Sequence, residues 1–341
     1  MQKLFGQAAV RSLVLNLSLA LVSVFGLCGA APASATPTSA PLADVSFMPI
    51  GTTWLLTLHF HSASGGKSDQ DAFFKNTIER RPGFRRLQKQ IEKVLGVNIS
   101  SQIKTWWIFG TAHAPKGGTS VIDSSVSAGK ITAQLQRNAD KSRDSYDGIT
   151  IYRINYHAKH RRGPGLGPTF VAVVKPGIIL GSLSEKLLEQ SLDCHLRVKK
   201  SVSPHSHLFS GWNGHDLLYF SVVHLQRAID AAQNPLMVPP QIRAVKSIHL
   251  MVVSVPKAVR IHGYLHMLSA KAAIRSAAQL KALKKLAYHA NSGANATDRQ
   301  MVLAGAILRL KINSSGHNVQ FNWRIPYALL LRLGPPHKRG G

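Results

Sequence analysis

Histidine is the residue type in this sequence with the most chemistry to offer. Sixteen are present among 341 residues, and two pairs have the spacing that places both imidazoles on one face of a β-strand. The pairs are His59 with His61, and His262 with His266, which has Arg260 and Tyr264 beside it. A zinc or copper site needs three or four convergent ligands. The four histidines are therefore metal-ligand candidates, and we favour the alternative that histidine serves as a solvated polar residue and adds charge in acid.

Signatures of known hydrolases are missing from the sequence. It contains no Gly-x-Ser-x-Gly elbow, no His-Glu-x-x-His and no phosphate-binding loop. The closest pair of carboxylates, Asp69 and Asp71, lies in a polar loop, where acids more often cap a helix than catalyse. We expect no catalytic residue and no cofactor, and a metal-dependent hydrolase that uses the paired histidines is the alternative.

Runs of basic residues are the candidate binding sites for anions. One run precedes and enters an expected helix, and another occupies a loop tip. Their residues are Arg80, Arg81, Arg85, Arg86, Lys159, Arg161 and Arg162. Such runs attract anionic envelope polymers or membrane headgroups, and solvated faces without a partner are the alternative.

The charge balance is set by missing carboxylates. Lys and Arg number 42 against 15 Asp and Glu, a formal net charge of +27. The basic fraction of about 12% is ordinary, whereas a dedicated nucleic-acid binder gains Lys and Arg. Few carboxylates suit a protein that works in acid, because acid denaturation is largely the protonation of paired carboxylates. We therefore expect little change in stability between about pH 7 and pH 4 if most histidines are exposed.

The N-terminus has the layout of a secretory signal. Two basic residues precede a short apolar stretch, 12–27, and an Ala-Ser-Ala motif ends at Ala35. The stretch is shorter than the roughly 20 residues that span a bilayer. Residues 1–35 are thus a predicted signal peptide, with lipid attachment at Cys28 as the rival. The mature chain is predicted to be soluble and exported, to the periplasm or the extracellular space.

The mature chain would hold one thiol, Cys194, since Cys28 is removed with the signal. An intramolecular disulfide is then excluded, and stability must come from packing. His195 follows directly, but neighbours on a helix do not face each other. Cys194 is therefore predicted to be a buried structural residue.

Alternating strand and helix patterns predict an α+β protein. It would have two similar modules of mainly antiparallel sheet, with helices packed on one face and a suggested internal duplication. The predicted parts are a leader at 36–52, module 1 at 53–196, a linker at 197–215, module 2 at 216–333 and a basic tail at 334–341. Module 1 includes an amphipathic helix at 84–95, and module 2 a long helix at 269–287 and a hairpin at 247–268.

These observations predict where the protein is located but indicate no particular reaction. We expect an exported, non-catalytic binding or structural component of the cell envelope, adapted to an acidic exterior.

Overall fold

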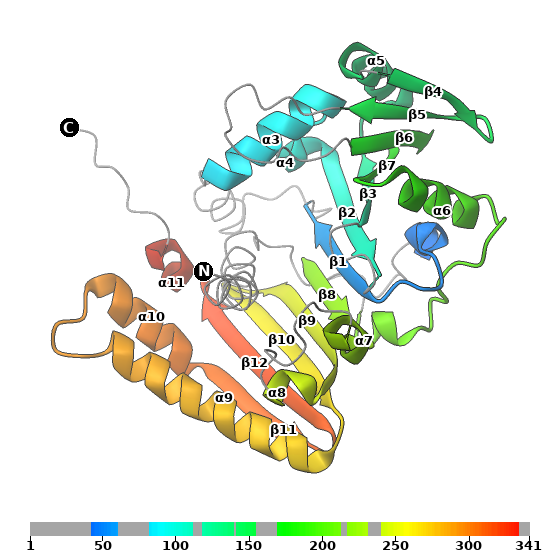
Figure 1. Cartoon of the computed structure of the whole chain (residues 1–341). Coiled ribbons are helices and arrows are strands. Elements are labelled where there is room, and N and C mark those ends of the chain that lie inside the picture. Colours follow the sequence, from blue (N-terminus) through cyan, green and yellow to red (C-terminus); the bar gives the residue numbers. More distant parts are fainter. Residues whose placement is uncertain are drawn as a thin grey trace, which may run out of the picture. The chain divides into compact units, whose positions relative to one another are not determined.

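The computed structural model describes residues 42–60, 82–111, 118–139, 141–154, 169–212, 217–230 and 240–333 (Figure 1). The chain forms two compact units. Unit 1 comprises Met1–Thr36, Ser62–Phe84 and His215–Gly341, and unit 2 comprises Pro37–His61 and Arg85–Gly214. All strand pairs within the described parts of the units are antiparallel, and helices accompany them. The predicted α+β class is confirmed.

Unit 2 contains seven of the strands, in the order β1-β2-β3-β7-β6-β5-β4. The strands are β1 (Trp54–His59), β2 (Ile103–Gly110), β3 (Thr119–Ser124), β4 (Lys141–Tyr146), β5 (Ile149–Ile154), β6 (Thr169–Lys175) and β7 (Ile178–Ser182). The helices are η1 (Leu42–Phe47), α3 (Pro82–Leu95), α4 (Ile99–Gln102), α5 (Ala128–Asn138), α6 (Glu185–His195) and η3 (His207–Phe209).

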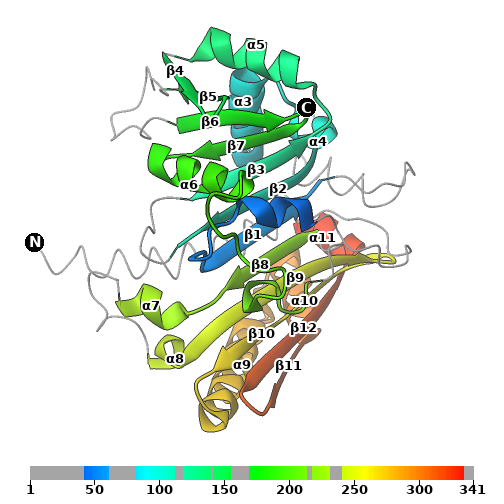
Figure 2. The ribbon, with the colours of Figure 1, turned by 90° about the vertical axis from the view of Figure 1, so that its right-hand side faces the viewer.

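Helices cover both faces of this sheet. Helices α3 and α6 lie on opposite sides of it (Figures 1 and 2). Neighbouring residues within one strand, such as Ile179 and Leu180 of β7, are both buried, although they point to opposite faces. Burial of both faces also accounts for the adjacent Trp106 and Trp107, of which Trp107 is 2% exposed.

Unit 1 contains five strands, in the order β8-β9-β10-β12-β11. They are β8 (Leu218–Val222), β9 (Val245–Val255), β10 (Ala258–Met267), β11 (Leu310–Ser315) and β12 (Asn318–Pro326). The helices are α7 (Leu225–Asp230), α8 (Pro240–Arg243), α9 (Ala270–Asn291), α10 (Asp298–Leu308) and α11 (Tyr327–Leu333).

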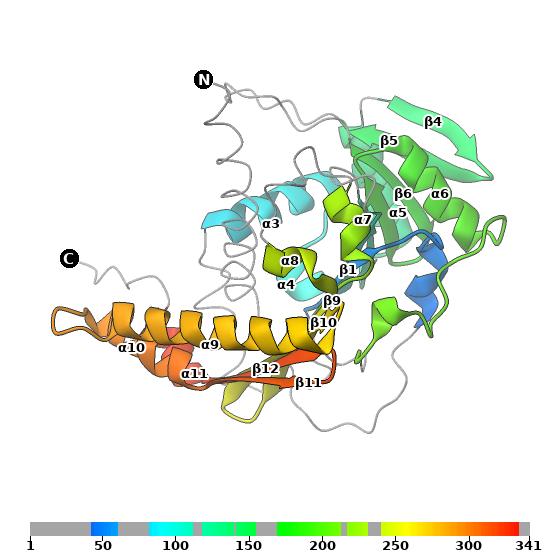
Figure 3. The same cartoon turned by 60° about the horizontal axis from the view of Figure 1, so that its bottom comes forward.

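The long helix α9 packs on one face of this sheet, beside α10 (Figure 3). Ser269 caps its first turn by accepting a hydrogen bond from the backbone N–H of Ala272. The small residues Ala273 and Ala277 let the helix approach the sheet, where Ile312 and Val319 complete an apolar core. In unit 1, therefore, α9 and α10 cover one face of the sheet, and the polar side chains of β10 and β12 lie on the other face.

The order of elements is similar in the two units. In each, the first strand is followed by helices and a hairpin, and the last strand lies beside that hairpin, as β7 beside β3 and β12 beside β10. This is a likeness of topology, and the internal duplication remains a prediction.

The predicted linker, 197–215, is described up to residue 212, and this described part belongs to unit 2. Val202, Leu208 and Phe209 are buried, and Trp212 packs edge-on against Trp107 with ring centroids 5.3 Å apart. The domain boundaries stay predictions, and residues 1–41 and 334–341 lie outside the described residues. Among the helices described, none has both the length and the apolar character to cross a membrane.

Candidate anion-binding face of unit 1

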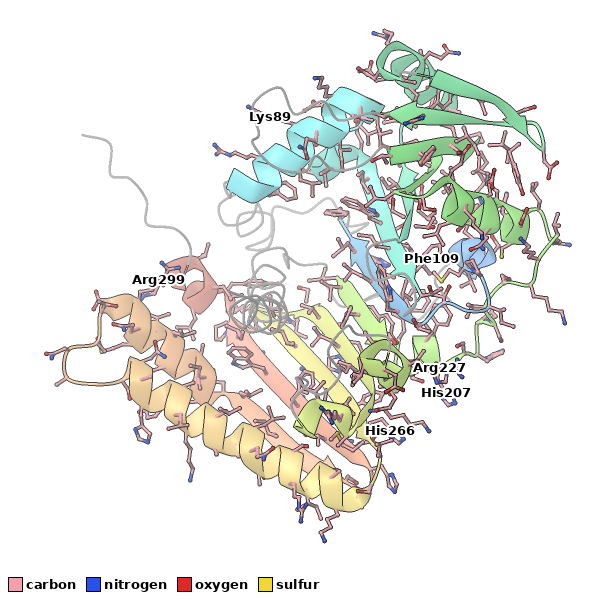
Figure 4. The ribbon with its side chains drawn as sticks, in the orientation of Figure 1. Lys89, Phe109, His207, Arg227, His266 and Arg299 are labelled. Atoms are coloured by element: carbon pink, nitrogen blue, oxygen red, sulfur yellow. The ribbon has the colours of Figure 1, made fainter. Side chains whose placement is uncertain are left out.

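One face of the unit 1 sheet is polar because residues alternate along its strands. In β10, Val259 and Ile261 are 2% and 3% exposed, whereas Arg260 between them is exposed. The side chains of β10 continue to alternate between the two faces as far as His266, which is partly buried (Figure 4). His262 and His266 thus share one face with Arg260, as their spacing predicts.

Four residue pairs of β10 and β12 cross this face, here termed the polar face. They are Arg260 with Arg324, His262 with Asn322, Tyr264 with Gln320, and His266 with Asn318. On the adjacent edge strand β11, Lys311 lies opposite Asn322 and Asn313 opposite Gln320. Successive pairs are about 7 Å apart along the strands, so the polar face is about 20 Å long.

The Arg260–Arg324 pair places two positive charges directly opposite each other. Such like-charged cross-strand pairs are destabilising. In the part of the chain that the structure describes, the Arg260 side chain makes no ion pair, and Arg324 donates only a long hydrogen bond, 3.4 Å, to the carbonyl of Pro256. An anion between the two guanidinium groups would relieve the repulsion.

The described part of unit 1 contains few carboxylates. From residue 217 to residue 333 the sequence has 15 Lys and Arg, and its only acids are Asp230 and Asp298. Asp298 lies in the first turn of α10, a helix on the other face of the sheet. Among the residues that the structure describes, the polar face therefore carries arginine and lysine side chains and no carboxylate.

Toward β9 and β8 the polar face becomes a buried hydrogen-bond network. His249 is 2% exposed, and its ring stacks on Tyr264 with centroids 4.6 Å apart. Its Nδ1 lies 3.2 Å from the hydroxyl of Tyr219 and 3.1 Å from that of Ser221, and its Nε2 lies 3.2 Å from the hydroxyl of Ser247. This network holds the β9 side of the face in one arrangement.

His262 stands between the buried network and the exposed arginines. Burial lowers the pKa of its imidazole below the ordinary value, and the charge of Arg260 lowers it further. The Nδ1 of His266 donates a hydrogen bond to the amide oxygen of Asn318 at 2.9 Å, and the His266 ring stacks near that of His317. Neither histidine faces a carboxylate among the described residues of β9, β10 or β12.

The structure does not bring the metal-ligand candidates together where it describes them. His262 and His266 are four residues apart on one strand, a separation of about 13 Å. His59 ends β1 in unit 2, and His61 lies outside the described residues. No three His, Cys, Asp or Glu residues in the described ranges could hold a metal ion together. The metal hypothesis stays a prediction.

The anion-binding candidates from the sequence lie largely outside the described residues. Arg85 is exposed on α3, the helix that also carries Lys89 (Figure 4), and the backbone of Arg86 belongs to the same helix. The remaining candidates, Arg80, Arg81, Lys159, Arg161 and Arg162, fall in the undescribed ranges.

Reasoning from the sequence missed Arg324 and its neighbours on β12. The signal was present, because Asn318, Gln320, Asn322 and Arg324 alternate with Val319, Phe321, Trp323 and Ile325. Basic residues that alternate along a strand form no run, so a search for basic runs passes over them.

Cys194 has the structural role that the sequence predicts. Its side chain is buried and forms no disulfide among the described residues, and Sγ lies 3.6 Å from the carbonyl oxygen of Lys200. Burial raises the pKa of this thiol, which keeps it protonated and poorly nucleophilic.

Comparison with known proteins yields similarity at the level of structure only. No protein-family model and no curated protein matches the sequence. Crystal forms III, I and IV of TP0453 match 88% of this chain and 98%, 97% and 96% of their own, with TM-scores of 0.46, 0.44 and 0.47 and identities of 12%, 12% and 13%. Similarity at this level has no bearing on function.

Proposed function

We propose that this protein is an exported, non-catalytic binding component of the cell envelope, which holds anionic polymers on the polar face of unit 1. The observation that carries the proposal is the Arg260–Arg324 pair, two exposed cations directly opposite each other on neighbouring strands. The few acids of residues 217–333 support it further, because a surface of one sign attracts polymers of the other.

Binding to an anionic polymer in varied NaCl tests this function. Sodium polygalacturonate and polyphosphate are suitable probes, with neutral dextran as the control polymer. The double variant Arg260→Gln/Arg324→Gln should bind both anionic probes about tenfold more weakly. Because two charge contacts are lost, the salt dependence should also flatten, by about two in the slope of log K against log salt by analogy with phosphate contacts.

A matched control removes the same charge elsewhere in unit 1. Lys271 and Arg275 are exposed on α9, the helix on the other face of the sheet. Lys271→Gln/Arg275→Gln should leave the affinity nearly unchanged. Equal losses in the two double variants would show that binding follows net charge and does not use the polar face.

Export is a separate part of the proposal, and it is supported by the signal-like N-terminus. Cleavage after Ala35 would leave Thr36 as the first residue of the protein isolated from its host. N-terminal sequencing or intact mass determines this directly. Retention of Met1, or a lipid on Cys28, would contradict it.

Metal analysis addresses the alternative, a metal-dependent hydrolase. Protein purified without a tag should contain no stoichiometric zinc or copper by mass spectrometry. One metal ion per chain would instead support the hydrolase and would direct mutagenesis to His59, His61, His262 and His266.

A further inference from the structure

We propose that the ligand of the polar face is an acidic polysaccharide, whose carboxylate lies between Arg260 and Arg324 and whose hydroxyls bind the amide side chains of β12 and β11. This inference rests on the proposed function and names the chemical class of its ligand.

The arginine pair fits a carboxylate. A guanidinium is a planar fork of N–H donors that matches the two oxygens of a carboxylate. Arg260 and Arg324 are exposed and directly opposite each other on neighbouring strands. One carboxylate on a polymer could therefore accept hydrogen bonds from both side chains.

Beyond the arginines, the next positions carry uncharged amides. Asn322, Gln320 and Asn313 are exposed, and in the described part of the chain their side chains make no hydrogen bond. Each amide has a carbonyl oxygen that accepts and an NH₂ group that donates.

The amides favour a glycan over a polyphosphate. A sugar hydroxyl both donates and accepts, so it can satisfy both ends of an amide. An ionised phosphate only accepts, and it would leave the amide carbonyls facing oxygen atoms. A surface built for polyphosphate would also be expected to carry Arg or Lys at these positions, as it does at Lys311.

The shape of the site suits an extended polymer. Arg260, Gln320, Asn322 and Arg324 are exposed, and α9 and α10 occupy the other side of the sheet (Figure 3). The charged pair stands at one end of the polar face, and polar pairs follow at intervals of about 7 Å. One chain could therefore run along β10 and β12, with its carboxylate at the arginine end and several sugar rings over the amides.

The experiment compares the binding of three polymers to the parent protein and to two double variants by isothermal titration calorimetry. The probes are sodium polygalacturonate, polyphosphate and dextran. The decisive variant is Gln320→Ala/Asn322→Ala, which removes two exposed amides and no charge. It should weaken polygalacturonate binding about tenfold and leave polyphosphate binding unchanged. Gln320→Glu/Asn322→Asp keeps the size of both side chains and should abolish polygalacturonate binding by repulsion.

The outcomes separate this inference from the proposed function. If polyphosphate binds as tightly as polygalacturonate, and the double alanine variant binds both like the parent protein, anion binding stands and the polysaccharide is wrong. If no anionic polymer binds, both fail. Dextran should not bind the parent protein, and tight dextran binding would overturn the role of the arginine pair. Unchanged circular dichroism of each variant confirms folding.

Discussion

At the scale of single residues, Asp193 of unit 2 is a buried carboxylate that both Tyr146 and Lys199 contact. Its side chain is 9% exposed, in a chain of only 15 acids. The hydroxyl of Tyr146 donates to Oδ1 at 2.5 Å, and the ammonium of Lys199 donates to Oδ2 at 2.6 Å. Burial opposes ionisation, but the two hydrogen bonds together outweigh it and hold the pKa of this carboxyl below its ordinary value. Asp193 therefore ties β4 and residue 199 to the end of α6.

Asp193→Asn should lower the free energy of unfolding by about 1–3 kcal/mol, because Lys199 and Tyr146 lose an ionised acceptor. Tyr146→Phe, which keeps the Lys199 contact, should cost about 1 kcal/mol. Since the pKa of Asp193 is lowered, its contribution is present above the ordinary carboxyl value and is lost below about pH 4. Urea unfolding at pH 7 and pH 3 measures this. An Asn variant as stable as the parent at pH 7 would show that the contacts do not stabilise the fold.

Some of these residue environments could be predicted from the sequence and others could not. The burial of Cys194 follows from its type and its helix. The pairing of Asp193 could not be predicted, since its partners Tyr146 and Lys199 come from β4 and from the segment after α6. Long-range partners of this kind leave no local pattern.

At the scale of elements, local patterns predict the helices well. The helix expected at 84–95 is α3, which ends before Gly96, a residue with φ +67°. By contrast, β4 (Lys141–Tyr146) was not predicted, because its sequence, KSRDSY, has almost no apolar residues. It is the last strand at one edge of the sheet, where charge protects against further pairing. For the polar face, the sequence predicted that His262 and His266 lie on one side of β10, and it missed the residues of β12.

Gly263 of β10 permits a close approach between strands. A Cβ at this position would collide with the backbone carbonyl oxygen of His249 and lie 2.6 Å from the ring of Phe321. Gly263→Ala should therefore destabilise the protein by about 1–3 kcal/mol through overpacking. Gly305→Ala in α10 is the matched control. A Cβ there meets nothing within 4 Å, so the change should stabilise the helix by about 0.5–1 kcal/mol. Thermal unfolding compares them, and the same sign for both would contradict this account.

At the scale of the whole molecule, the packing of residues 197–212 bears on whether this segment is a linker between two modules. Composition predicts a linker here, yet Leu208 and Phe209 are buried.

Trp212→Ala removes the ring that packs on Trp107 and should speed tryptic cleavage after Arg197, Lys199 and Lys200, because the segment loses an anchor. Limited proteolysis with mass spectrometry measures the rate. His205→Gln, at an exposed position, is the control. Equal rates in the parent and Trp212→Ala would show that the packing does not restrain the segment.

The pH dependence of stability also belongs to the whole molecule, since groups in both units set it. Composition predicts a nearly flat profile, because few carboxylates are available to lose. Two histidines depart from that expectation. Burial lowers the pKa of His195 in unit 2, with a smaller effect from Lys175, and burial with Arg260 lowers the pKa of His262 in unit 1. At the alkaline end, the hydrogen bond to Asp193 raises the pKa of Tyr146 to about 12.

The sign of each effect follows from which state binds more protons. Below the ordinary histidine pKa of about 6.5, the unfolded chain takes up protons that folded His195 and His262 resist, so stability falls as the pH falls. Above about pH 10, the unfolded chain loses the Tyr146 proton that the folded chain keeps, so stability falls as the pH rises.

The melting temperature should therefore be highest between about pH 6.5 and pH 10. His195→Asn/His262→Gln should flatten the acid side and leave the alkaline side unchanged. A parent protein whose melting temperature stays level from pH 7 to pH 5 would contradict the lowered pKa values and restore the flat profile.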